Sequence, residues 1–68
     1  MIMSISERKI DLLLARREMT RYQLSQESGV SRANLSTVIV RGTCKPETAG
    51  KIARALGVDV TEIMEDER

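Results

Sequence analysis

The sequence contains no histidine, tryptophan or phenylalanine, and its 68 residues include one cysteine and one proline. Histidine and clustered cysteines supply most transition-metal ligands, and histidine is the commonest general base in enzymes. Their scarcity argues against catalysis, so we expect no enzyme activity, no metal site and no cofactor. The lone Cys44 excludes a disulfide within the chain, which agrees with a reducing cytoplasm.

Aromatic residues and long apolar segments are also scarce. Tyr22 is the only aromatic residue, so the chain lacks the stacking platform with which proteins bind single-stranded nucleic acids. Any nucleic-acid partner is therefore expected to be a duplex. The longest apolar run covers residues 12–15, far below the ~20 residues of a membrane span. We expect a cytoplasmic protein without a membrane segment, and no insertion suggests a small-molecule ligand.

The formal net charge of +1 conceals an uneven distribution of charge. Residues 1–58 contain ten Lys and Arg against five Asp and Glu, a net charge of +5. The last ten residues contain five acids and one Arg, a net charge of −4. A basic body suits a phosphate backbone, although many surfaces of soluble domains are also rich in Lys and Arg.

Periodic apolar residues and helix-capping residues predict one domain over residues 1–68, an all-α compact five-helix bundle. The first four helices are expected over residues 7–17, 21–28, 32–40 and 46–56, with a last short helix after Asp59. Gly50 falls within the fourth of these. We interpret it as a place where another helix approaches closely, with simple tolerance of a glycine as the alternative.

Two capped helices are predicted to meet at Gly29. Thr20 and Gln23 form the pattern of a capping box before the second helix, and Ser31 is a typical cap for the third. Gly29 can adopt the left-handed conformation that ends one helix and turns the chain into the next. The segment from about residue 20 to 40 is therefore predicted to form a helix-turn-helix. Asp59 and Glu62 predict a second capping box, within an acidic C-terminal helix and tail over residues 59–68.

The spacing of Ser25, Gly29, Leu35 and Val38 fits two crossing helices with the last two side chains directed into a core. In this spacing the chain resembles the lambda repressor and Cro family of DNA-binding domains, also called the xenobiotic-response-element type. The segments that also carry the resemblance are residues 24–26, 29–32, 46–48 and 52–58. The resemblance covers residues 5–64. It implies five helices, a homodimer, and a third helix that enters the major groove of double-stranded DNA.

Three features depart from the usual pattern of this family. Ser25 replaces the common Ala, Arg21 stands where Gln is frequent, and the segment 31–42 is one residue longer than usual. The extra residue lies in the apolar triplet 38–40. Either Ile39 or Val40 is therefore expected to be exposed or used in a contact.

Helical geometry then assigns candidate roles on the third helix. With Leu35 and Val38 facing inward, the base-reading candidates are Arg32, Ala33, Ser36 and Thr37. Arg32 can donate two hydrogen bonds to guanine, and Ala33 can touch a thymine methyl group. The alternative for Arg32 is an ordinary solvated side chain.

A second set of residues is placed for contacts with DNA phosphates. It comprises Arg21, Tyr22, Ser31, Asn34, Arg41 and Lys45. Plain solvation is the alternative for Arg41 and Lys45. Tyr22 can instead pack on the first helix with its hydroxyl directed outward.

These residues favour a sequence-specific transcriptional regulator, a repressor that acts as a dimer by occluding an operator. The alternative is an antitoxin-like or polymerase-contacting protein-interaction module whose DNA binding is secondary. The acidic C-terminal helix is either a dimer interface or the segment that closes the monomer core.

Overall fold

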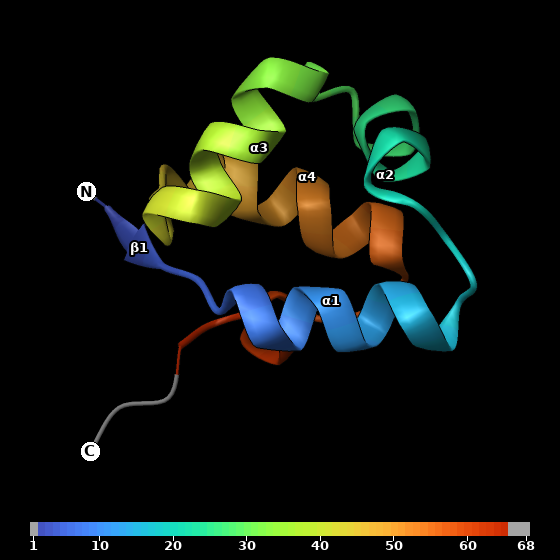
Figure 1. Ribbon diagram of the computed structural model, residues 1–68. Coiled ribbons are helices and arrows are strands. Elements are labelled where there is room, and N and C mark those ends of the chain that lie inside the picture. The colour runs from blue at the N-terminus through green and yellow to red at the C-terminus, as the bar shows by residue number, and fades with distance from the viewer. Residues whose placement is uncertain (1, 66–68) are drawn as a thin grey trace.

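A computed structural model describes residues 2–65 of the chain (Figure 1). Its elements are β1 (Met3–Ser4), α1 (Glu7–Arg16), α2 (Arg21–Ser28), α3 (Arg32–Arg41), β2 (Thr43–Cys44), α4 (Pro46–Leu56) and the 3-10 turn η1 (Val60–Glu62). The described part of the chain is therefore mostly helical, as predicted. The expected all-α bundle of five helices is corrected in two respects, because η1 replaces the fifth helix and two strands are present.

The helix boundaries follow the capping residues that the sequence indicates. Ser6 and Ser31 each accept a hydrogen bond from the backbone N–H three residues later, at 3.1 and 3.2 Å. Thr20 and Gln23 form the reciprocal capping box at the start of α2. These bonds satisfy N–H groups that have no partner within the helix, and α1 to α3 begin where expected. The helix α4 also begins where expected, at Pro46, without a side-chain cap.

The turn between α2 and α3 is short and tightly bonded. Gly29 has φ 79°, in the left-handed region, and its N–H donates to the carbonyl of Ser25 at 3.0 Å. The buried hydroxyl of Ser28 accepts from the N–H of Val30 at 3.2 Å. Three residues thus reverse the chain between α2 and α3, which confirms the predicted helix-turn-helix.

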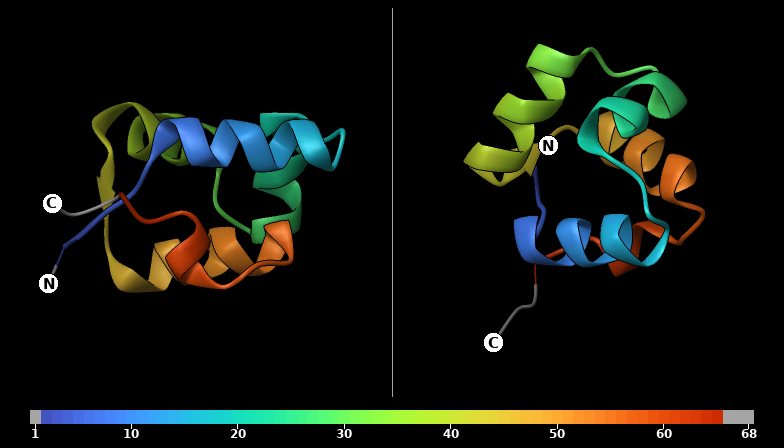
Figure 2. Two further views of the ribbon diagram at one scale, coloured as in Figure 1. Left: turned by 90° about the horizontal axis from the view of Figure 1, so that it is seen from below. Right: turned by 45° about the vertical axis from the view of Figure 1, so that its right-hand side comes forward.

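One hydrophobic core joins all four helices. Its fully buried large side chains are Ile10, Leu24, Leu35, Ile39, Ile52, Leu56 and Ile63. The helix α2 packs against both α3 and α4, and α3 lies at the opposite end of the molecule from α1 (Figure 2). Within the triplet 38–40, Ile39 is buried and Val40 is 73% exposed, which settles the alternative left open by the sequence.

The segment 3–6 lies between the loop after α3 and the C-terminal segment and bonds to both. Met3 lies opposite Cys44 and Ser4 opposite Thr43, and the N–H of Ile5 donates to Gly42 at 2.9 Å. On the other side of this segment, the N–H of Ser6 donates to the carbonyl of Ile63, and the carbonyl of Ser4 accepts from the N–H of Glu65. Burial raises the pKa of the Cys44 thiol in β2, so this group is uncharged near neutral pH.

The expected C-terminal helix is a single 3-10 turn. Asp59 accepts hydrogen bonds from the N–H and hydroxyl of Thr61, at 3.0 and 2.6 Å, rather than sharing a capping box with Glu62. These bonds lower the pKa of Asp59. Ile63, directly after η1, enters the core of its own chain with 0% exposure, so this segment closes the monomer core. The remainder of the predicted acidic tail, residues 66–68, lies outside the described residues.

Gly50 does not mark a close approach of helices, contrary to our interpretation. It is exposed, and a Cβ atom built on it would meet no atom within 4 Å. The space around Gly50 therefore accommodates a side chain, and simple tolerance of a glycine is the interpretation that agrees with the structure.

Gly50→Ala is expected to stabilise the fold by about 0.5–1 kcal/mol, because alanine has the higher helix propensity and nothing obstructs its methyl group. The matched change Gly29→Ala should destabilise it by about 1–2 kcal/mol, because φ 79° strains an L-residue although the site is equally open. Thermal unfolding followed by circular dichroism measures both. A loss of stability in Gly50→Ala would mean that the surroundings of α4 are misassigned.

Candidate nucleic-acid interface

The solvent-facing side of α3 forms a continuous surface. Its exposed residues are Arg32, Ala33, Asn34, Ser36, Thr37, Val40 and Arg41. Because successive helical residues are separated by about 100°, Ala33, Thr37 and Val40 lie near the centre of the side opposite the buried residues. All four predicted base-reading residues, Arg32, Ala33, Ser36 and Thr37, are thus exposed on one element.

The centre of this surface is rich in methyl groups. The hydroxyl of Thr37 donates to the carbonyl of Ala33 at 3.0 Å, so its proton is engaged within the helix while its methyl group remains for contacts. Val40 adds two more methyl groups at 73% exposure. The sequence left Val40 as one of two candidates for exposure, and only the packing of Ile39 identifies it.

Arg32 and Tyr22 are brought together from α3 and α2. The guanidinium carbon of Arg32 lies 5.5 Å from the centroid of the Tyr22 ring, the geometry of a cation–π contact. The Tyr22 hydroxyl accepts a hydrogen bond from the side chain of Gln26 at 3.0 Å. Tyr22 therefore supports the start of α3, a role that sequence reasoning did not assign to it.

A shallow groove of about 270 Å³ runs between α3 and α4. Its lining residues are Gly29, Val30, Ser31, Asn34, Thr37, Val38, Arg41, Thr48 and Lys51. Three predicted phosphate contacts, Ser31, Asn34 and Arg41, thus meet in one groove. Thr48 and Lys51 were missed, because only the packing of α4 beside α3 reveals that they share this groove.

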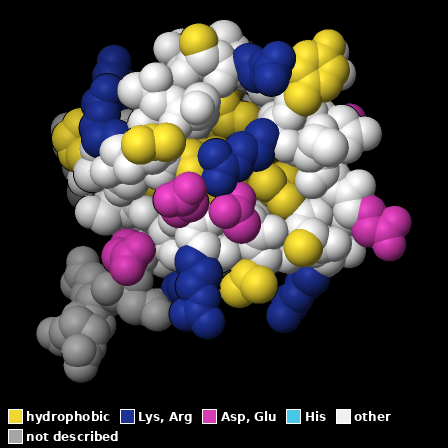
Figure 3. Space-filling view, in the orientation of Figure 1, with side chains coloured by type: hydrophobic (Ala, Val, Ile, Leu, Met, Phe, Trp, Pro, Cys, Tyr) yellow, Lys and Arg dark blue, Asp and Glu magenta, His cyan; other side chains and the backbone are white. Residues whose placement is uncertain are grey.

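Arg21 is directed toward α1 rather than standing alone. Its guanidinium donates to the carboxylate of Asp11 at 2.9 and 3.1 Å and to Glu7 at 3.2 Å. The bond with Asp11 is the main cause of a raised pKa for Arg21. On the face shown in Figure 3, most of the visible acidic side chains lie toward α1 and the C-terminal end, whereas the part over α3 carries basic, polar and apolar groups.

The N-termini of α2 and α3 supply partial positive charge beside this surface. Neither helix has an acidic residue in its first turn. Backbone N–H groups at such ends attract anions, phosphates included. Lys45 is exposed at the start of α4 but does not line the groove with Arg41.

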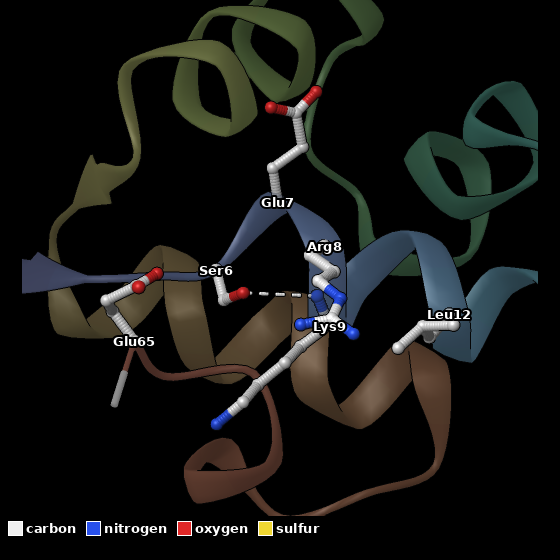
Figure 4. Close-up of a pocket in the computed structure, with 6 residues that line it drawn as sticks. All are labelled: Ser6, Glu7, Arg8, Lys9, Leu12 and Glu65. Atoms are coloured by element: carbon white, nitrogen blue, oxygen red, sulfur yellow. Dashed lines mark hydrogen bonds between the residues drawn. The ribbon is translucent and has the colours of Figure 1, made fainter. Parts of the chain in front are cut away.

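A second hollow, of about 540 Å³, lies along the outer side of α1 (Figure 4). It is lined by Ser6, Glu7, Arg8, Lys9, Leu12 and Glu65. The carboxylate of Glu7 points away from Lys9, toward the side of α1 on which α2 and α3 lie (Figure 4), and it pairs with Arg21. The mixed signs of charge in this lining give it no preference for an anion or a cation.

The fold defines a helix-turn-helix domain of the kind that binds DNA, with one side of α3 exposed to solvent. The family model of the Cro/C1-type HTH DNA-binding domain matches residues 9–68, and the chain belongs to this family. No match to the chain was found among curated proteins or among solved structures. Within residues 2–65, no helix is long and apolar enough to cross a membrane. The same residues contain no group of three or more potential metal ligands.

Asp11→Asn should strengthen duplex binding up to about fivefold, because it removes a negative charge and frees Arg21 from its strongest partner. The logarithmic salt dependence should steepen by about one unit if Arg21 then contacts a phosphate. Fluorescence anisotropy across a salt series measures both quantities.

The control for this prediction is Glu62→Gln, which removes the same charge from an exposed position on η1 and should change affinity less. In an Arg21→Ala background, Asp11→Asn should no longer steepen the salt dependence. Equal effects of Asp11→Asn and Glu62→Gln would show that net charge alone is responsible.

Proposed function

We propose that this chain is a sequence-specific regulator of transcription that reads the major groove with α3 and represses by covering its operator. The supporting observation is the exposed side of α3, held by the helix-turn-helix between basic groups and free of acidic residues. The role is one of binding rather than catalysis, and we place it in the cytoplasm.

On this proposal, base recognition divides between one arginine and a set of methyl groups. Arg32 donates two hydrogen bonds to the O6 and N7 of a guanine. Ala33, Thr37 and Val40 contact thymine methyl groups, and the Ser36 hydroxyl bonds with a base edge. Val40 extends the reading surface beyond the four residues predicted from the sequence, because it shares their exposed side.

Phosphate contacts are proposed on both sides of the reading helix. A ten-residue helix is about 14 Å long between its terminal residues, comparable to the ~12 Å width of the major groove. Arg41, Ser31 and Asn34 line the α3–α4 groove, to which we add Lys51 and Thr48. Lys45 and the Tyr22 hydroxyl remain proposed contacts, and Arg21 can reach a phosphate only by leaving its carboxylate partners.

Arg32→Ala should reduce discrimination at one symmetric pair of operator positions by about 1–3 kcal/mol, because a bidentate contact with one base is lost. Arg41→Ala should weaken binding to operator and random duplex alike and lower the salt slope by about one. Both mutants remove one exposed positive charge from the same helix, so each controls for the other.

Affinities for the operator, its single-base variants and random duplex at several salt concentrations test this assignment. If Arg32→Ala lost affinity equally for all duplexes while Arg41→Ala changed the base preference, the roles of the two arginines would be reversed. Weak dependence of all binding on salt would instead favour a protein-interaction module, since apolar interfaces release few counterions.

Homodimerisation is proposed because a single reading helix covers too few base pairs to specify a genomic address. We expect selection from a random duplex library to recover a pseudo-palindrome with half-site centres about one helical turn, ~10 base pairs, apart. The mass of the complex should correspond to two chains per duplex. Recovery of asymmetric single half-sites bound by one chain would contradict dimeric recognition.

A further inference from the structure

The guanidinium of Arg32 lies over the ring of Tyr22 on the surface of the free protein. Arg32 is the first residue of α3 and is exposed, a setting in which an arginine ordinarily samples many rotamers. Within residues 2–65 no carboxylate forms a salt bridge with it, and its described contact is the ring of Tyr22 at 5.5 Å. The orientation of Arg32 therefore depends on an aromatic ring rather than on an acid.

The Tyr22 ring is itself held in place by α2. Its hydroxyl accepts from Gln26, one turn later on the same helix, at 3.0 Å. The backbone carbonyl of Tyr22 accepts from the buried Ser25 hydroxyl at 2.7 Å. Since the Gly29 turn fixes α2 relative to α3, the half-exposed ring lies beside the first turn of α3.

The chemistry of this contact matters for what Arg32 can still do. When a guanidinium stacks parallel to a ring, the contact uses its face, whereas a carboxylate would occupy the N–H groups along its edge. Hydrogen bonds to the O6 and N7 of guanine are made by that same edge. A ring can therefore orient Arg32 without consuming the donors that a base requires.

We propose that Tyr22 is a specificity-determining positioning residue that orients Arg32 for its contact with guanine. This inference rests on the proposed reading of a base by Arg32. A cation–π contact at an exposed site corresponds to a factor of about two to five in an equilibrium constant. A complete bidentate contact corresponds to about five- to 150-fold discrimination. Loss of the ring should thus remove part of the discrimination, not all of it.

The experiment compares Tyr22→Leu, Tyr22→Phe, Arg32→Ala and the double variant Tyr22→Leu/Arg32→Ala. For each, affinity is measured for the selected operator and for the duplex in which the guanine identified by Arg32→Ala is replaced by adenine. The readout is the ratio of the two affinities. A uniform loss of affinity cancels in this ratio, including loss of a phosphate contact by the Tyr22 hydroxyl or partial unfolding.

Tyr22→Leu should lower the ratio about two- to fivefold, while Tyr22→Phe should keep it within twofold because the ring remains. The double variant should discriminate no less than Arg32→Ala alone, since Tyr22 acts through Arg32. Circular dichroism melting reports separately on folding. A merely structural role would lower stability and overall affinity but leave the ratio unchanged.

The outcomes separate this inference from the proposed function. If Arg32→Ala alters discrimination but Tyr22→Leu does not, Arg32 reads a base without help from the ring and the positioning role is rejected. A higher ratio in Tyr22→Leu would show that the ring holds Arg32 away from DNA, which also overturns it. If Arg32→Ala alters discrimination at no position, the assignment of Arg32 to base reading fails, and the inference fails with it.

Discussion

The crossing of α2 over α3 is the constraint on which the rest of the surface depends. It is set by a three-residue turn in which Gly29 takes the left-handed conformation and Ser31 caps the next helix. Leu24 and Leu35, both nearly inaccessible to solvent, fill the interior on either side of that turn. Once these side chains are buried, the exposed side of α3 is determined. The positions of the proposed base-reading and phosphate-binding residues on α3 then follow from helical geometry.

The helices were predictable because their signals are local. Caps such as Thr20 with Gln23, and the apolar period of α4, lie within a few residues of the structure that they specify. The strands were not predictable from the sequence, since each has only two residues and Ser4 pairs with Thr43, far along the chain. Asp59 is a genuine cap, but the burial of Ile63 and the bond from Glu65 to Ser4 end the helix after one turn.

The candidate site was predictable to the level of the helix and its exposed side. Exposure of Arg32 and Thr37 follows from their spacing relative to Leu35, which is a property of the sequence. The environment of each side chain cannot be predicted in this way, because it is formed by residues on different elements. The contact of Arg32 with Tyr22, and the groove that Lys51 shares with Arg41, both require the packed arrangement of three helices.

The electrostatics of the site come from arrangement rather than from net charge, which is only +1. Arg32 and Arg41 lie at the two ends of α3, while Glu7 and Asp11 lie on α1 within reach of α2. Pairing with Arg21 limits the negative field of these carboxylates near the N-terminus of α2. Removing Arg21 would therefore withdraw a cation and expose two anions together.

A loss of DNA affinity on removal of Arg21 consequently has two physical sources. One is a lost phosphate contact, and the other is repulsion between DNA and the unpaired carboxylates of Glu7 and Asp11. Both terms weaken with salt, so a salt series on an Arg21 variant alone does not separate them. Combining the Arg21 variant with neutralisation of its partner Asp11 distinguishes these two sources. If Arg21 mainly shields the carboxylates, removing Arg21 should cost less DNA affinity once Asp11 is neutralised. If Arg21 mainly binds a phosphate, removing it should then cost more.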